Sequence, residues 1–398
     1  MMDPVRNPYA PGAGTPPPEL AGRDELRETI RICLERARIG RPAKSLLMVG
    51  LRGVGKTVLL DRMRLDAESS GLHTARVEAP EGRSLPSLLA PQLRQVLLRL
   101  SKTERARDLA QRALRGLAGF ATALKVKYQD ITVGLDFEPE PGLADNGDLE
   151  MDLQALFEAC GMAAREGETV LALFIDELQY VPEEELAALI TALHQIAQRT
   201  LPVVLIGAGL PQLRGRMGKA KSYAERLFSF PEVGALPPPE ARRAIVLPAE
   251  AEGVAVEDAA LEEIIRQTHG YPYFLQEWGK HAWDIASASR ITHEDMRQAT
   301  TMAITDLDEG FFRVRFDRLT PTEKRYLRAM AELGAGPHRS GDIAEVLKKG
   351  VTALGPTRAQ LIAKGMIWSP SHGDTAFTVP LFDEYMKRIM PDTDWRLR

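Results

Sequence analysis

The residues with the clearest chemistry are eight consecutive positions, 50–57, which read GLRGVGKT. They satisfy the pattern G-x-x-x-x-G-K-[ST] at every fixed position. The apolar run 45–49 before them predicts a strand, and 58–63 after them predicts a helix. Glycines let the backbone approach an anion, and the free N–H groups of a helix N-terminus point at it. This pattern therefore predicts a loop that binds the phosphates of a nucleotide.

Two side chains of this loop have distinct expected roles. Lys56 should reach the β- and γ-phosphates, and the hydroxyl of Thr57 should hold Mg²⁺. We therefore expect ATP or ADP together with Mg²⁺ as the ligands. The candidate nucleotide contacts of the loop are Gly50, Leu51, Arg52, Gly53, Val54, Gly55, Lys56, Thr57 and Val58.

A pair of acidic residues, Asp176 and Glu177, follows the apolar run 169–175. A run that is apolar throughout is typical of a parallel strand buried on both faces, and ligands bind at the carboxyl ends of such strands. Asp176 should orient Mg²⁺ and its waters, and Glu177 should polarise the attacking water. Such a pair can also simply start a helix, but the phosphate loop earlier in the same alternation favours the catalytic interpretation.

The elements that must position these residues alternate between strands and helices. Further strands are expected at 72–79, 202–207 and 228–236, with helices between them, so the fold class is α/β with a doubly wound parallel sheet, as in P-loop NTPases. The Arg-rich helix expected at 101–119 is interpreted as a solvated face. The alternating segment 125–138 predicts a β-hairpin inserted into this domain.

The flanking segments suggest three further parts. Residues 1–19 are rich in Pro and Gly, which predicts an extended and weakly ordered arm before a nucleotide-binding domain at 20–238. This arm is either a plain tail or a segment that packs over the nucleotide. Residues 239–309 are helical throughout, as in a lid that follows the sheet. Residues 310–398 combine three helices with a hairpin at 367–379, the layout of a winged helix-turn-helix.

Composition narrows the function classes. The 398 residues carry a net charge of −4, and no apolar run approaches the ~20 residues of a membrane span. Cys33 and Cys160 lack metal or redox spacing, so we expect a cytoplasmic protein with two buried thiols. Residues 318–398 hold 13 Lys and Arg against 9 Asp and Glu, an asymmetry that suggests a DNA-binding end.

In their order along the chain, these motifs resemble AAA+ ATPases of the origin-recognition initiator type. Gly22 and Arg23 resemble the adenine-side entry of that family. Arg226 stands where such proteins have an arginine that reaches the γ-phosphate of a neighbouring subunit, although a surface salt bridge is the alternative. The resemblance implies ATP hydrolysis and self-association.

The same resemblance implies that the winged helix binds duplex DNA. Arg358 and Lys364 would then contact DNA from the recognition helix. Winged helices also mediate protein contacts, so a protein partner is the alternative.

Two departures from the family pattern would weaken hydrolysis more than binding. The fourth strand ends in Gly207-Ala208-Gly209 without a polar side chain. The lid reads Gly270-Tyr271-Pro272-Tyr273, with Tyr273 where the family has an arginine. Gly-x-Pro resembles the STAND signalling ATPases, in which the lid proline, here Pro272, packs near the base. Three hypotheses stay open: a slow ATPase whose nucleotide state controls DNA binding or assembly, a nucleotide-controlled signalling switch with a protein partner, and a nucleotide-binding scaffold with almost no hydrolysis.

Overall fold

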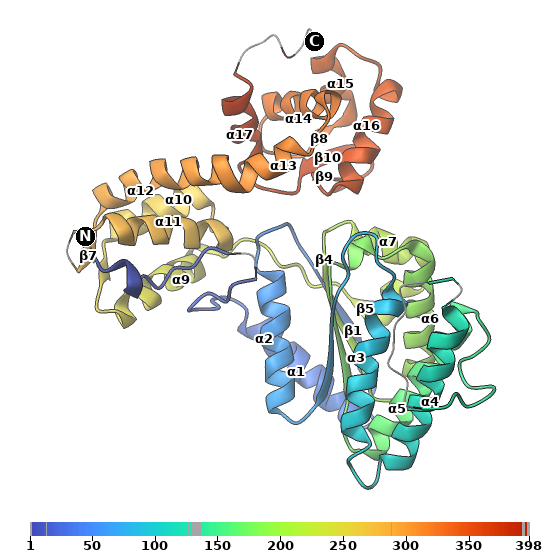
Figure 1. Ribbon diagram of the computed structural model, residues 1–398. Coiled ribbons are helices and arrows are strands. Elements are labelled where there is room, and N and C mark those ends of the chain that lie inside the picture. Colours follow the sequence, from blue (N-terminus) through green and yellow to red (C-terminus); the bar gives the residue numbers. More distant parts are fainter. Residues whose placement is uncertain are drawn as a thin grey trace. The chain divides into compact units, whose positions relative to one another are not determined.

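The computed structural model describes residues 2–12, 14–125, 127–128, 137–287, 289–391 and 395. The chain divides into two compact units (Figure 1). The first unit comprises Met1–Gly22, Leu51–Gly55 and Gly234–Arg398, and the second comprises Arg23–Gly50 and Lys56–Val233. Each unit is described in turn. No helix in these stretches combines the length and the apolar character needed to cross a membrane.

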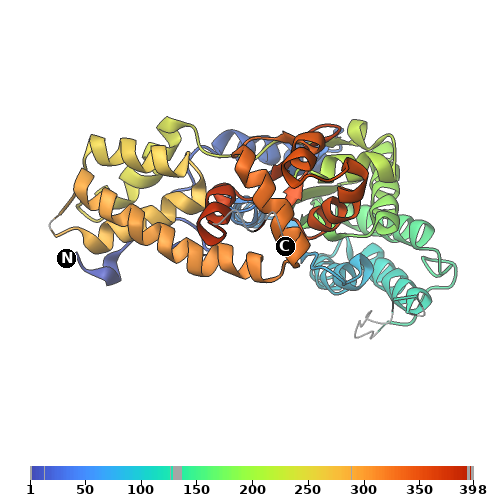
Figure 2. The same ribbon diagram turned by 90° about the horizontal axis from the view of Figure 1, so that it is seen from above.

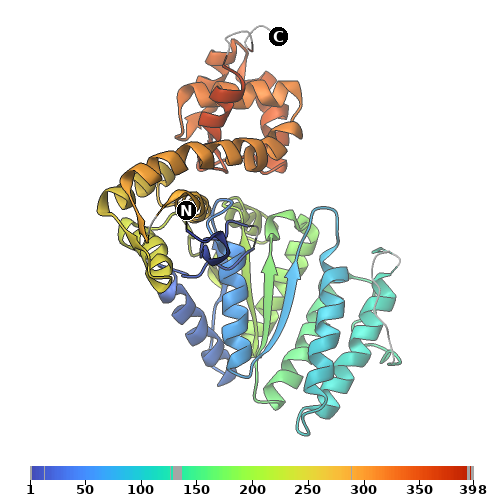
Figure 3. The ribbon, with the colours of Figure 1, turned by 60° about the vertical axis from the view of Figure 1, so that its left-hand side comes forward.

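A five-stranded parallel sheet forms the centre of the second unit, which confirms the predicted α/β fold class. The strands are β1 (Ser45–Val49), β2 (His73–Glu78), β3 (Leu171–Asp176), β4 (Val203–Gly209) and β5 (Phe228–Ser229), in the order β2-β3-β4-β1-β5. Every residue of β1, β3 and β4 is buried, because helices cover both faces of the sheet (Figure 3).

The fifth strand is much shorter than the predicted 228–236. Only Phe228 and Ser229 pair with β1, and an isolated bridge joins Glu232 to Val49. Pro231 interrupts the pairing because proline has no N–H to donate to a neighbouring strand.

Eight helices accompany the sheet over the part of the second unit that is described. They are α1 (Asp24–Arg38), α2 (Lys56–Ser69), α3 (Leu85–Leu100), α4 (Arg107–Leu124), α5 (Leu149–Glu166), α6 (Glu183–Gln198), α7 (Leu213–Ala220) and α8 (Ala224–Leu227).

The interpretation of the Arg-rich helix as a solvated face is wrong in part. α4 begins at Arg107 and buries Leu114, Leu117 and Phe120 against the core, while its arginines lie on the opposite side. The hairpin predicted at 125–138 falls mostly outside the described residues.

In the first unit, four helices occupy the region predicted as a lid: α9 (Pro238–Ala251), α10 (Asp258–Thr268), α11 (Pro272–Ile285) and α12 (His293–Asp306). A short parallel pair, β6 (Ala255–Val256) with β7 (Arg290–Ile291), joins their connections. Thr292 and Asp295 form a reciprocal capping box that starts α12. A π-helical turn (Leu307–Phe312) and α13 (Arg313–Asp317) continue α12 as one helical run (Figure 2).

The C-terminal part contains α14 (Pro321–Leu333), β8 (His338–Arg339), α15 (Ser340–Leu347), α16 (Val351–Ala363), β9 (Ile367–Trp368), β10 (Asp374–Phe377) and α17 (Phe382–Ile389). The three strands form an antiparallel sheet in the order β8-β10-β9. Helices therefore precede a hairpin, in the order expected from the sequence. α16 begins at Val351 and includes Pro356 within the helix.

The N-terminal arm packs on the lid helices, contrary to the expectation of a weakly ordered tail. Tyr9 is 3% exposed, and its hydroxyl donates a hydrogen bond of 2.5 Å to the carbonyl of Ile245 on α9. Its ring lies against Gly279 of α11, where an added Cβ would lie 2.8 Å from the ring. The amide of Asn7 donates to the carbonyl of Lys280. The contacts of Tyr9 with Ile245 and Gly279 thus hold in place a segment whose composition suggests disorder.

Tyr9→Ala should destabilise the lid. Removing a buried aromatic side chain costs about 3 to 5 kcal/mol, through lost burial and the cavity that remains. The midpoint of thermal unfolding should fall, and hydrogen exchange should accelerate in α9 and α11. Val5→Ala is the matched control, because Val5 lies in the same arm but is 91% exposed. Equal unfolding midpoints for the two variants would contradict a structural role for the arm.

Candidate nucleotide-binding site

The two predicted Mg²⁺ ligands meet in the second unit. Thr57 lies in the first turn of α2, and Asp176 is the last residue of β3. The Thr57 hydroxyl donates a hydrogen bond of 2.7 Å to Oδ2 of Asp176, whose side chain is buried. Magnesium prefers oxygen ligands and is usually held by one or two protein groups together with phosphates and waters. The hydroxyl and the carboxylate therefore fit a Mg²⁺–nucleotide complex at this helix N-terminus.

The phosphate loop has the backbone that its glycines predict. Gly53 and Gly55 have φ angles of 80° and 87°, in the left-handed region that favours glycine. A Cβ at Gly55 would meet no atom within 4 Å, so conformation rather than space requires glycine there. Nζ of Lys56 donates a hydrogen bond of 3.0 Å to the carbonyl of Gly50, which folds the ammonium group back over the loop.

Glu177 has an unusual backbone conformation for a residue with a side chain. Its φ and ψ are 57° and 33°, and its N–H donates to Oδ1 of Asp176 at 2.8 Å. A left-handed residue other than glycine costs roughly 1 to 2 kcal/mol, and such strain gathers at functional sites. This turn of the backbone sets the direction of the Glu177 carboxylate directly after Asp176.

Gln179 is a site residue that the sequence analysis missed. It is 3% exposed; its amide nitrogen donates to the Glu177 carboxylate, and its carbonyl oxygen accepts from the N–H of Leu210 at 3.0 Å. An added Cβ at Gly209 would lie only 2.8 Å from that oxygen. A polar group thus does lie at the end of β4, but it comes from the loop after β3. Gly209, which has no side chain and so leaves room for this oxygen, is the feature of the sequence that could have indicated it.

Gln179→Ala should lower the ATP turnover of the protein by about tenfold and leave its affinity for ATP within about twofold. The variant removes the amide that orients Glu177, whereas the loop that binds phosphate keeps all its contacts. Steady-state hydrolysis and equilibrium nucleotide binding give the two numbers. Gln198→Ala, at an exposed glutamine of α6, is the control. An equal loss of affinity and turnover would instead indicate that Gln179 only maintains the fold.

Arg76 on β2 is a second residue that was missed. Its Nε donates to Asp61 at 3.0 Å, and its Nη2 lies 3.7 Å from Oδ2 of Asp176. The guanidinium therefore offsets part of the charge of the buried Asp176 carboxylate. Nothing in a single arginine of a strand predicts this contact, because it depends on the parallel pairing of β2 with β3.

In the first unit, residues 51–55 of the phosphate loop contact the Gly-x-Pro segment of the lid. The hydroxyl of Tyr271 donates to the carbonyl of Arg52, and the N–H of Tyr273 donates to the carbonyl of Gly53 at 3.2 Å. Pro272 is the first residue of α11, where its missing N–H is not needed. The carbonyl of Thr378 accepts a hydrogen bond of 3.3 Å from the N–H of Arg52. These contacts place the backbone of the loop against the lid and the C-terminal part of the same unit.

Arg315 adds a half-buried positive charge to this cluster. Its guanidinium lies 3.9 Å from the ring centroid of Phe311, and that ring stacks on Tyr273 at 4.8 Å. Burial, together with the positive charge of Arg52, lowers the pKa of Arg315 to about 10. No carboxylate in the described stretches forms an ion pair with Arg315. Two arginines close to each other at the phosphate loop favour the binding of an anion. This could not be predicted, because Arg315 is remote in the chain from every motif.

The remaining predicted nucleotide contacts are placed as follows. Arg226, on the short helix α8, is exposed and has no ion pair with any residue that the structure describes. Gly22 has a φ of 66°, and a Cβ there would meet Glu240 of the same unit. Burial lowers the pKa of Arg23. The roles of all three toward a nucleotide stay predictions.

The two residues predicted to contact DNA are engaged within the C-terminal part. The guanidinium of Arg358 donates to the hydroxyls of Thr375 and Ser369 at 2.9 Å and to the carbonyl of Asp374 at 2.8 Å. Nζ of Lys364 lies 2.7 Å from Glu323. These contacts tie α16 to the hairpin and to α14, so they give both side chains a role in the fold that the sequence analysis did not anticipate.

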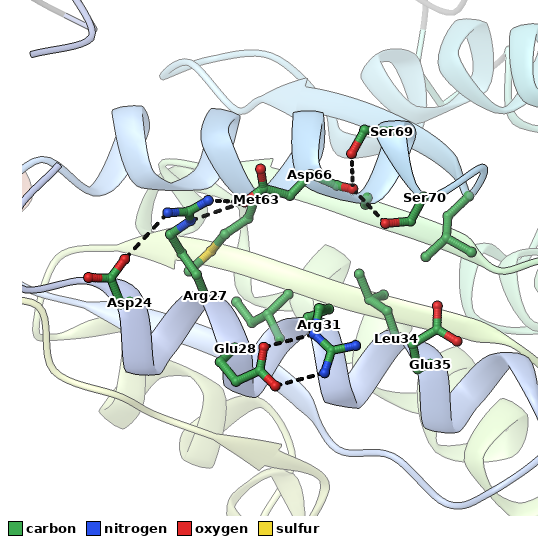
Figure 4. Close-up of a pocket in the computed structure, with 13 residues that line it drawn as sticks. Asp24, Arg27, Glu28, Arg31, Leu34, Glu35, Met63, Asp66, Ser69 and Ser70 are labelled. Carbon is green, nitrogen blue, oxygen red and sulfur yellow. Dashed lines mark hydrogen bonds and ion pairs between the residues drawn. The ribbon is translucent and has the colours of Figure 1, made fainter. Parts of the chain in front are cut away.

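A separate cavity of about 430 Å³ lies between α1 and α2 in the second unit (Figure 4). The charged groups in its lining pair with one another, namely Arg27 with Asp66 and Arg31 with Glu28. On α2 its lining begins at Met63, about 10 Å along the helix from Lys56. This cavity is therefore distinct from the phosphate loop, and we assign no nucleotide to it.

Comparison with solved structures agrees with this fold. The Walker-type ATPase PABY2304 of Pyrococcus abyssi is 17% identical, with a TM-score of 0.57 over 94% of this chain and 97% of that chain. Orc1 of Aeropyrum pernix in complex with DNA is 15% identical over 94% of each chain, with a TM-score of 0.46. The RuvB Holliday junction branch migration motor of Thermotoga maritima is 17% identical over 92% and 95%, with a TM-score of 0.42. The likeness to the Walker-type ATPase shows that the two chains share a fold.

Family models match two segments of the chain. Residues 309–386 match a domain of unknown function, DUF8462, and residues 19–206 match the model described as an AAA ATPase domain. A search of curated proteins gives no match. Residues 19–206 are thus similar to an AAA ATPase domain, and the parallel sheet and the phosphate loop of this segment agree with that match.

Proposed function

We propose that this protein binds Mg²⁺–ATP, hydrolyses it slowly, and uses the nucleotide state to control DNA binding or assembly. The observation that carries the proposal is the meeting of Thr57 and Asp176 at 2.7 Å, with Glu177 next in the chain. Thr57 and Asp176 would hold Mg²⁺, which when bound neutralises charge on the phosphates. Glu177 orients and polarises the attacking water, while Lys56 binds the phosphates.

We expect ATP hydrolysis to be slow because the lid and the fourth strand provide few polar groups for the transition state. β4 ends in glycine, and Gln179 reaches its end from another loop, where it holds Glu177 rather than a phosphate. Tyr273 replaces the arginine that the AAA+ resemblance leads one to expect, and Arg315 is a half-buried cation that lies near this position. Fewer groups aimed at the developing charge of the transition state mean a smaller rate enhancement.

DNA binding is proposed for the C-terminal part because of its element order and its charge. α14, β8, α15, α16 and the β9–β10 hairpin follow the order of a winged helix. Since Arg358 and Lys364 are engaged within the fold, the exposed Lys348 and Lys349 after α15 are better placed to neutralise phosphates.

The test is fluorescence anisotropy of labelled duplex DNA at two salt concentrations, with no nucleotide, with ADP and with a non-hydrolysable ATP analogue. Binding that depends on the nucleotide and weakens with salt supports the proposal. Lys348→Ala with Lys349→Ala should weaken that binding, whereas Lys44→Ala, at an exposed lysine of the other unit, should not. Absence of binding in every nucleotide state at low salt would refute DNA control.

The contacts between Tyr271, Tyr273 and the phosphate loop favour a second candidate, a signalling switch with a protein partner. In this alternative, the position of the lid helix α11 depends on which nucleotide the phosphate loop binds. Exchange of ADP for ATP, rather than hydrolysis, then determines the signal to the partner protein. Tyr271→Phe removes the hydroxyl that donates to Arg52 and keeps the ring. Faster ADP release from this variant, without DNA binding by the parent protein, would favour the switch.

Arg226→Ala should reduce ATP turnover only at protein concentrations at which subunits associate. An exposed arginine that reaches a neighbouring γ-phosphate can contribute roughly 10³ to 10⁵ in related phosphoryl transfer. Turnover per subunit should therefore rise with concentration in the wild type and stay low in the variant. Arg242→Ala, an exposed arginine of α9 that pairs with Asp258, is the control. Wild-type turnover that is independent of concentration would argue against this role.

A further inference from the structure

Three side chains that the proposed ATPase chemistry does not use gather between two helices of the first unit. Glu277 and His281 are one turn apart on α11, and Asp306 is the last residue of α12. Nε2 of His281 lies 3.3 Å from Oε1 of Glu277 and 3.1 Å from Oδ2 of Asp306. One ligand atom from each residue lies within 4.8 Å of the other two. α11 and α12 run side by side (Figure 1), which brings the three groups to a common point.

The imidazole at the centre of this cluster is buried without a hydrogen bond. The side chain of His281 is 5% exposed and that of Glu277 is 7% exposed. Neither ring nitrogen of His281 has a hydrogen-bond partner among the residues described. Both carboxylate oxygens are close enough to Nε2, yet neither is aligned for a hydrogen bond. Leaving a buried polar group without such a partner is unfavourable, so this arrangement favours a ligand at the imidazole.

The spacing of the three atoms matches the ligands of one metal ion. Tetrahedral zinc has bonds of about 2.0 to 2.2 Å to imidazole nitrogen and carboxylate oxygen, which puts neighbouring ligand atoms about 3.3 Å apart. The two observed separations, 3.1 and 3.3 Å, fall at this value. Mg²⁺ and Ca²⁺ prefer oxygen ligands to imidazole, whereas zinc and other first-row transition metals bind imidazole well.

We propose that Glu277, His281 and Asp306 form a binding site for a transition-metal dication of the zinc class. Asp306 is half exposed, so solvent can supply the fourth ligand from its side. The ion joins α11 to the end of α12, at the start of the π-helical turn, and therefore fixes the C-terminal half of the lid. Tyr273, whose pKa is raised by burial and by the charge of Glu277, lies beside the cluster and is suited to orient the Glu277 carboxylate.

The competing explanation is an ion triad in which a protonated His281 balances two carboxylates without a metal. The two explanations differ in a direct binding measurement on the full chain. The protein is stripped with a chelator and titrated with Zn²⁺ in the absence of nucleotide. We expect one equivalent to bind, a rise of several degrees in the unfolding midpoint, and a visible Co²⁺ spectrum with the intensity of tetrahedral coordination.

The variants Asp306→Asn and His281→Gln should each weaken Zn²⁺ binding by about tenfold or more. Asp306→Asn is the more informative, because a half-exposed residue can change without disturbing the lid core. His293→Gln is the matched control, since His293 is an exposed histidine on α12. The proposal is overturned if the stripped protein binds no zinc, or if Asp306→Asn binds it as tightly as the wild type. Zinc held instead at Thr57 and Asp176 would survive all three substitutions and would also overturn it.

Discussion

Replacing Lys56 with alanine will weaken ATP binding by about 100-fold or more, because truncating one partner of a buried charged contact costs about 2 to 5 kcal/mol. Lys56 is 8% exposed, and its ammonium already lies over the loop through its hydrogen bond to Gly50. The loss should therefore be in affinity for the phosphates rather than in folding. Titration of a fluorescent ATP analogue in the presence of Mg²⁺ measures it.

Lys44→Ala is the control for this experiment, because Lys44 is an exposed lysine directly before β1. It removes the same charge from the same domain without touching the loop. Both variants should unfold at the temperature of the wild type when no nucleotide is present. If Lys56→Ala bound ATP as tightly as the wild type, residues 50–57 would not be the nucleotide site.

Glu177→Gln will keep ATP affinity within about twofold and lower the rate of hydrolysis by about 10² to 10⁴, the range for a positioned general base. The amide has the size of the carboxylate and leaves Asp176 and Thr57 unchanged, but it cannot accept a proton from water. Single-turnover hydrolysis, measured beside equilibrium binding, separates the two effects.

An acidic residue from the same region provides the comparison. Glu183, in the first turn of α6, is exposed and pairs with Lys219, so Glu183→Gln should leave hydrolysis unchanged. Hydrolysis by Glu177→Gln at the wild-type rate would remove Glu177 from the mechanism. A common loss in both variants would indicate a general electrostatic effect.

Local pattern was enough to predict most of the sheet. β1, β3 and β4 are continuous apolar runs, and each was predicted within about two residues of its observed bounds. Their apolar character reflects burial on both faces, which depends on the strand itself. The fifth strand was overestimated because Pro231 and the pairing with β1 limit it, and pairing is a property of two segments.

The residues of the candidate site show the same difference between features of local sequence and contacts between distant segments. Thr57, Asp176 and Glu177 were predictable because each belongs to a motif at fixed positions. Arg76 and Arg315 were not, since their roles arise from contacts between segments remote in the chain, and the only sign of Gln179 was the glycine at the end of β4. Asp306 belongs to none of these motifs, and its position in the sequence does not predict its approach to His281.

The docking of the arm has a consequence for how this chain is synthesised. Tyr9 emerges from the ribosome first, but its partner Ile245 lies 236 residues later. At a synthesis rate of about 5 to 20 residues per second, Tyr9 is synthesised on the order of 10 to 50 seconds before Ile245. During that interval the sheet can fold, while Tyr9 and the prolines around it remain available to chaperones. We therefore expect the arm to dock only after α9 and α11 have been synthesised, and to be lost when either helix is truncated.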